Sequence, residues 1–244
     1  MGAAVGGPAR GREPESIRTV ERELRTPASA GAAGLVFSAL FSASLALLYR
    51  QPSGGTATAI AAWYARTDSK TIGLVGLYLV PFAGIAFLWF VAAVRSRIGT
   101  HEDRFFATVF LGSGILFVAM LFVAAAAAGA PFATVKFQGA PPPTPDVFVY
   151  ARGLAYTLLY VYGIRAAAVF MIVSSTIGLR TGTLSRWLAL LGYLVALVLL
   201  FSVSYARGFV FVFPAWVTAV SIELLVRARP NRLGGTPSPP TTSR

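Results

Sequence analysis

Residues 104–129 of this chain have the sequence RFFATVFLGSGILFVAMLFVAAAAAG, and this segment decides the fold. Apart from Arg104 it contains no charged residue, and it exceeds the ~20 residues with which a helix crosses the hydrocarbon core of a membrane. A surface helix of a soluble domain has one apolar stripe, whereas this helix would be apolar on every side. The segment therefore predicts a transmembrane helix.

Five further apolar segments of similar character lie on either side of this one. The six predicted spans are 28–49, 71–94, 104–129, 150–178, 186–206 and 208–226. Because the 244 residues are 56% hydrophobic and only 12% charged, little chain remains for a soluble domain. We predict an all-α polytopic membrane protein, a six-transmembrane-helix bundle with one membrane domain at 28–229. We expect cytoplasmic tails at 1–27, partly disordered, and at 230–244, disordered.

The net charge of +12 is distributed according to the positive-inside rule. Fourteen basic residues fall on the predicted cytoplasmic side: Arg10, Arg12, Arg18, Arg22, Arg25, Arg95, Arg97, Arg104, Arg180, Arg186, Arg227, Arg229, Arg232 and Arg244. Five fall on the other side: Arg50, Arg66, Lys70, Lys136 and Arg207. We therefore expect a protein of the cytoplasmic membrane with both termini in the cytoplasm. Since the arginines lie at helix ends instead of forming one patch, no nucleic-acid partner is expected.

The residues needed for metal or nucleophilic chemistry are scarce. The chain has no cysteine and one histidine, and consecutive residues such as His101, Glu102 and Asp103 at a helix start cannot converge on one ion. There is also no Gly-rich phosphate loop and no Gly-x-Ser-x-Gly motif. We expect no metal, no cofactor and no enzymatic activity.

Polar side chains at membrane depth are the candidate site, because a charge there is costly and usually has a partner or a function. Arg165 lies 15 residues before Arg180, which on a straight helix is about 22 Å and near mid-depth. Tyr162 precedes it by one turn. Two interpretations are open: Arg165 bonds backbone carbonyls freed where Pro81 and Pro214 bend their helices, or it lines a polar cavity that accepts an anion or a lipid headgroup.

The sequence also predicts a second polar stripe, an ion pair and a short surface helix. Arg152 and Tyr156, with Tyr160, form a second stripe on roughly the opposite side of the same predicted helix, closer to the outer surface. Glu223 is placed for an ion pair with Arg227 one turn later. Residues 59–65 contain Trp63 and Tyr64 and are too short to span, so a short helix at the membrane surface is expected.

Three stretches carry a resemblance to a known group of proteins. They are YLVPFAGIAFLWFVAAV (78–94), EDRFFATVFLGSGILFVAMLFV (102–123) and SSTIGLRTGTLSRWLALLGYLVALVLL (174–200). This part of the chain resembles uncharacterised six-helix integral membrane proteins of bacteria, chiefly actinobacteria. The resemblance implies the same topology and supplies no activity, substrate or site.

Two functions are compatible with these features. The first is a non-enzymatic scaffold or accessory subunit that packs against the lipid bilayer, another membrane protein or a second copy of itself, because small residues that allow close helix approach are abundant. The second is a small transporter or a carrier that binds lipid or an anion, with a polar site around Arg165.

Overall fold

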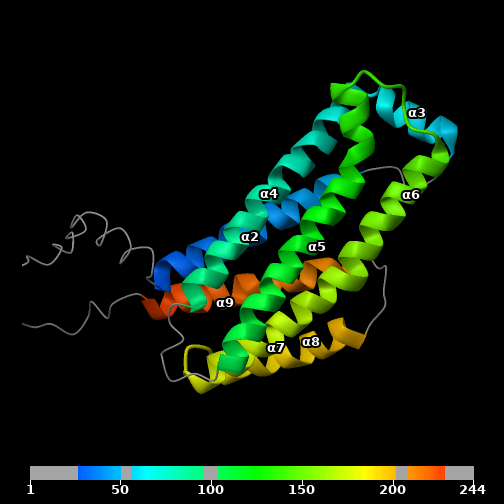
Figure 1. Cartoon of the computed structure of the whole chain (residues 1–244). Coiled ribbons are helices and arrows are strands. Elements are labelled where there is room, and N and C mark those ends of the chain that lie inside the picture. Colours follow the sequence, from blue (N-terminus) through cyan, green and yellow to red (C-terminus); the bar gives the residue numbers. More distant parts are fainter. Residues whose placement is uncertain (1–26, 51–55, 96–103, 202–207, 229–244) are drawn as a thin grey trace, which may run out of the picture.

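The structure, a computed structural model, describes residues 27–50, 56–95, 104–201 and 208–228, and every regular element within them is helical (Figure 1). The longer helices are α2 (Pro27–Leu48), α4 (Thr67–Arg95), α5 (Arg104–Phe137), α6 (Pro145–Tyr156), α7 (Ile164–Arg180), α8 (Arg186–Phe201) and α9 (Val212–Ala228). The shorter elements are α3 (Ala57–Ala65), the π-helical segment η1 (Thr157–Gly163) and the 3-10 turn η2 (Phe209–Phe211). The all-helical class is confirmed.

Among the described residues, five helices are long and apolar enough to cross a membrane. They are Ala28–Leu48, Gly73–Arg95, Arg104–Phe137, Pro145–Arg180 and Phe209–Ala228. The remaining predicted span, 186–206, is represented by α8, whose 16 residues make a helix of about 24 Å, shorter than the ~30 Å hydrocarbon core. The last residues of this predicted span, 202–206, lie outside the described ranges. The two predicted tails also lie outside them, apart from Pro27. The described helices thus establish five candidate spans, not six.

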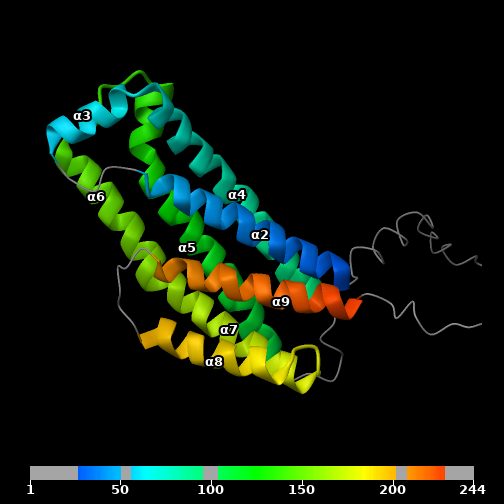
Figure 2. The same cartoon turned by 180° about the vertical axis from the view of Figure 1, so that it is seen from behind.

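The helices form an elongated bundle with two distinct ends (Figures 1 and 2). At the terminal end, α2 begins and α9 finishes. At the opposite end, which we call the cap end, α4, α5 and α6 extend further than α2 and α9, and α3 lies across them. In the bundle, α2 packs along α4 and α9, α5 packs between α4 and the α6–α7 helix, and α8 packs on α7.

A cluster of five buried phenylalanine rings holds the centre of the bundle together. Each of the five candidate spans contributes one of these rings: Phe37 from α2, Phe87 from α4, Phe117 from α5, Phe170 from α7 and Phe213 from α9. Phe41, Phe90 and Phe110 pack against them. The ring of Phe87 lies 4.7 Å from that of Phe37 and 5.2 Å from that of Phe117 between centroids, within the range of favourable aromatic pairs. The cluster connects all five candidate spans and does not include α8.

The cap end has a small apolar cluster of its own, formed by Ile60 and Tyr64 of α3, Phe132 of α5 and Phe148 of α6. It forms because α5 continues through Pro131 to Phe137, eight residues beyond the predicted segment. Burial raises the pKa of the Tyr64 hydroxyl to about 12, because the charged phenolate would be poorly solvated there. The short helix predicted around Trp63 and Tyr64 is confirmed as α3.

Helix bends were expected at Pro81 and Pro214, but of these two prolines only Pro81 lies in the interior of a helix. Pro81 lies inside α4, whereas Pro214 lies in the first turn of α9, where a missing N–H leaves no hydrogen bond unmade. The mid-helix position predicted for Pro214 is therefore wrong. Its carbonyl oxygen accepts a hydrogen bond from Ser38 Oγ at 3.0 Å, which joins α9 to α2.

The phenylalanine cluster predicts a large difference between two substitutions in α4. Phe87 is fully buried, whereas Phe82 is 60% exposed on the outer face of the same helix. Phe87→Ala should lower the free energy of unfolding by about 3–5 kcal/mol, because it leaves a cavity between five helices. Phe82→Ala should have little effect. Thermal unfolding of the purified protein in one detergent compares the two, and equal losses would contradict the central role of the cluster.

Candidate functional site

Four of the five predicted site residues lie on one continuous helix, in which α6, η1 and α7 follow one another without a break. Arg152 and Tyr156 belong to α6, Tyr162 to η1 and Arg165 to α7. A π-helical turn accommodates one more residue than an α-helical turn, so it rotates the residues that follow it relative to those that precede it. The side chains before and after η1 therefore face different surroundings.

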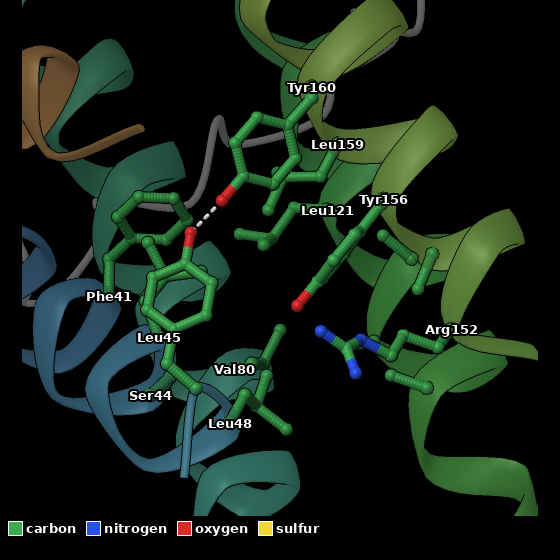
Figure 3. Close-up of a pocket in the computed structure, with 15 residues that line it drawn as sticks. Phe41, Ser44, Leu45, Leu48, Val80, Leu121, Arg152, Tyr156, Leu159 and Tyr160 are labelled. Atoms are coloured by element: carbon green, nitrogen blue, oxygen red, sulfur yellow. Dashed lines mark hydrogen bonds between the residues drawn. The ribbon is translucent and has the colours of Figure 1, made fainter. Parts of the chain in front are cut away.

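A cavity lies between α2, α5 and the α6–η1 part of this helix, with Val80 contributed by α4 (Figure 3). Its volume is about 50 Å³, more than the ~10–15 Å³ that one water requires. The lining residues are Phe41, Ser44, Leu45, Leu48, Tyr49, Val80, Leu121, Ala124, Ala125, Ala128, Arg152, Ala155, Tyr156, Leu159 and Tyr160. Four of them are alanines, whose short side chains leave the space open.

Three tyrosines and one arginine supply most of the polar groups of the cavity. The hydroxyls of Tyr49 and Tyr160 are hydrogen-bonded to each other, which joins the end of α2 to η1. The guanidinium carbon of Arg152 lies 5.1 Å from the ring centroid of Tyr156, a cation–π arrangement. Figure 3 shows the Arg152 guanidinium and the Tyr156 hydroxyl directed toward the same space, near Leu48 and Val80. The cavity thus combines cationic and hydroxyl donors with an otherwise apolar wall.

Arg165 and Tyr162 are not part of this cavity lining. Arg165 is half-buried, and its Nη1 donates a hydrogen bond of 2.7 Å to the carbonyl oxygen of Val161 in the preceding η1 segment. The expectation that Arg165 bonds carbonyls freed near Pro81 or Pro214 is therefore wrong, because the carbonyl belongs to its own helix. Tyr162 is 56% exposed on the outside of the bundle.

Glu223 lies at the terminal end of the bundle, where it fastens α9 to the turn between α7 and α8. Its carboxylate accepts hydrogen bonds from the Ser185 backbone N–H at 2.6 Å and from Ser185 Oγ at 3.1 Å. It also forms the predicted ion pair with Arg227, at 2.6 Å, which is confirmed. Arg227 in turn donates to the carbonyl of Gly182, whose φ of +66° favours glycine in this turn. We call these contacts of Glu223 and Arg227 with the α7–α8 turn the clamp, and their role is structural.

The five predicted residues therefore occupy separate places, and only Arg152 and Tyr156 meet in the cavity. Sequence reasoning did not select Tyr49, although it lines the same space from α2. A tyrosine at the end of a transmembrane segment is ordinary, because aromatic residues are common at both membrane interfaces. Nothing in the residue pattern distinguishes Tyr49 from such an interfacial tyrosine.

No protein-family model, curated protein or solved structure matches this chain. The resemblance to bacterial six-helix membrane proteins stays a prediction.

The clamp at the terminal end predicts a loss of stability when Glu223 is removed. Glu223→Ala leaves the Ser185 N–H and the Arg227 guanidinium without their carboxylate partner, which should cost about 1–3 kcal/mol of unfolding free energy. Arg186→Ala, at an exposed position of the neighbouring helix start, is the control and should have little effect. Thermal unfolding measures both, and an unchanged melting temperature for Glu223→Ala would contradict the clamp.

Proposed function

We propose that the chain is a six-span protein of the cytoplasmic membrane that binds the head of an amphiphile in the cavity between α2, α5 and α6, without catalysing a reaction. The observation that carries the proposal is the meeting of Arg152 and Tyr156 with an apolar wall in one cavity. Ligand sites commonly have this composition, in which a few converging polar groups orient a mostly apolar contact.

The position of Arg152 along its helix supports a ligand at the membrane boundary. Arg152 precedes Arg180 by 28 residues. On a helix this separation is roughly 40 Å, which exceeds the ~30 Å of the hydrocarbon core. If Arg180 lies at one boundary, Arg152 reaches the headgroup layer at the other. A guanidinium there avoids the cost of a charge at mid-depth and meets the polar part of an amphiphile.

The positions of the chain ends in the bundle support a sixth span. The first residue of α2 and the last residue of α9 lie at the same end (Figures 1 and 2), so the chain between them crosses the bundle an even number of times. Five candidate spans leave one crossing to α8, which runs along α7 and is joined to it by the hydrogen bond between Thr176 Oγ1 and Tyr193 Oη at 2.6 Å. These observations support α8 as the sixth span.

The distribution of basic residues supports one orientation. Of the described basic residues, Arg95, Arg104, Arg180, Arg186 and Arg227 lie toward the terminal end, whereas Arg50, Arg66, Lys136 and Arg152 lie toward the cap end. The sequence assigns nine further arginines to the predicted cytoplasmic side, and these supply most of the bias. By the positive-inside rule the terminal end faces the cytoplasm, and the cavity then opens in the outer half of the membrane.

The scaffold hypothesis remains a second prediction without a specific contact in its favour. Exposed apolar side chains such as Tyr78 and Phe82 of α4 and Leu194 of α8 offer surface to a partner, but lipid covers the same surface in a membrane. The lining of the cavity, by contrast, favours one chemical class of ligand, an amphiphile with a polar head.

Single cysteines test both the orientation and the sixth span, because the chain has no cysteine of its own. Gln138 is exposed beyond α5 at the cap end, Gly208 is exposed just before the span Phe209–Ala228, and exposed Arg186 lies at the terminal end. In intact cells, a membrane-impermeant maleimide should label Gln138→Cys and Gly208→Cys, and it should label Arg186→Cys only after permeabilisation. Labelling of Gly208→Cys and Arg186→Cys from the same side would show that α8 does not cross.

Filling the cavity tests the binding function itself. Ala128 lines the cavity, whereas Ala126, on the same helix, is exposed and does not. Ala128→Phe should occupy the space and remove amphiphile that co-purifies with the protein, and Ala126→Phe should leave the bound amount unchanged. Native mass spectrometry of protein extracted with its membrane lipid counts the adducts. Equal adduct numbers in the wild-type protein and both variants would refute binding in this cavity.

A further inference from the structure

We infer that the cavity selects a lipid whose phosphodiester headgroup has a net negative charge, and that Arg152 makes this selection. The inference rests on the proposed function, because it assigns a ligand class to the same cavity. The charges, the hydrogen-bond donors and the size of the site support it.

The charge of the lining favours an anion. Of the described residues that line the cavity, Arg152 is the cation and none is acidic. A headgroup with a quaternary ammonium, such as choline, would bring a second cation close to this guanidinium. A headgroup with a neutral alcohol on its phosphate would not, so an anionic phosphodiester is favoured over a zwitterionic one.

The hydrogen-bond donors of the lining also converge on Arg152 and Tyr156. Tyr49 and Tyr160 are bonded to each other, and Ser44 Oγ donates to the Leu40 carbonyl at 2.7 Å. The guanidinium of Arg152 has five N–H donors, so it retains capacity for a phosphate beside any other contact. Its planar fork matches two phosphate oxygens, and the cation–π contact with Tyr156 orients that fork without using an N–H.

The size of the site favours a headgroup whose chains remain in the bilayer. The cavity, of about 50 Å³, is too small for a whole lipid, so a headgroup enters it only in part and the chains stay outside it. A phosphate bonded to Arg152 would place the first methylene groups of its chains near apolar lining residues such as Leu48 and Val80 (Figure 3). Free inorganic phosphate would leave this apolar wall without a contact.

The test uses the full chain in nanodiscs of equimolar phosphatidylglycerol and phosphatidylcholine. Native mass spectrometry then measures the ratio of the two lipids that stay bound. The wild-type protein should enrich phosphatidylglycerol about fivefold, as expected for one arginine near a headgroup. Arg152→Gln should return the ratio to one while lipid remains bound. Arg165→Gln is the matched control, because Arg165 lies on the same continuous helix outside the cavity lining, and it should retain the enrichment.

Each other result overturns the inference. Enrichment that survives Arg152→Gln, or that falls equally in Arg165→Gln, shows that Arg152 does not select the lipid, and the proposed binding function stands as long as Ala128→Phe still removes the adduct. Loss of the enrichment on addition of millimolar inorganic phosphate, with the amount of bound lipid unchanged, identifies free phosphate as the ligand of Arg152. Adducts that persist in Ala128→Phe refute the proposed function itself.

Discussion

The contact on which the rest of this structure depends is the packing of five phenylalanine rings, one from each candidate span. In lipid there is no hydrophobic force between helices, so close packing must determine their arrangement. The Phe117 and Phe213 rings, 4.8 Å apart at an interplanar angle of 63°, hold α5 and α9 at a definite distance. Further along α5 the same inward face carries Ala124, Ala125 and Ala128. The helices are spaced by large rings at the centre, and the cavity lies where the side chains become small.

The π-helical segment explains how one helix contributes to both the cavity and the central packing. Before η1, the α6 side chains Arg152 and Tyr156 face α2, and after it Phe170 of α7 joins the ring cluster, 5.1 Å from Phe87. The extra residue in the wide turn changes the register between these two inward faces. Arg165, directly after η1, returns its guanidinium to the carbonyl of Val161 within that segment. The irregular turn and the arginine that bonds to it thus form one local unit.

Local patterns in the sequence predicted much of the fold, and contacts between distant residues account for what was missed. Hydropathy identified five helices, and the one-turn spacing predicted the pair of Glu223 with Arg227. The hydrogen bonds from Ser185 to the same Glu223 connect residues 38 positions apart, so no periodic pattern in the sequence could predict them. Phe37 and Phe87 are two of 18 phenylalanines in apolar segments, and nothing local shows which of them face inward. The π-helical turn and the role of Tyr49 also depend on neighbouring helices.

The two arginines of the α6–α7 helix show why the conspicuous charge was the weaker indicator of a site. A guanidinium expected at mid-depth stands out in a sequence because it is costly there, and the structure shows the Arg165 guanidinium bonded to a carbonyl of its own helix. At the membrane boundary, where we propose that Arg152 lies, a guanidinium has little cost to offset, so it is less noticeable in an apolar sequence. Its guanidinium lines the cavity beside the ring of Tyr156. In a bundle of this kind, the cation near the boundary that faces a cavity is therefore the better candidate for binding.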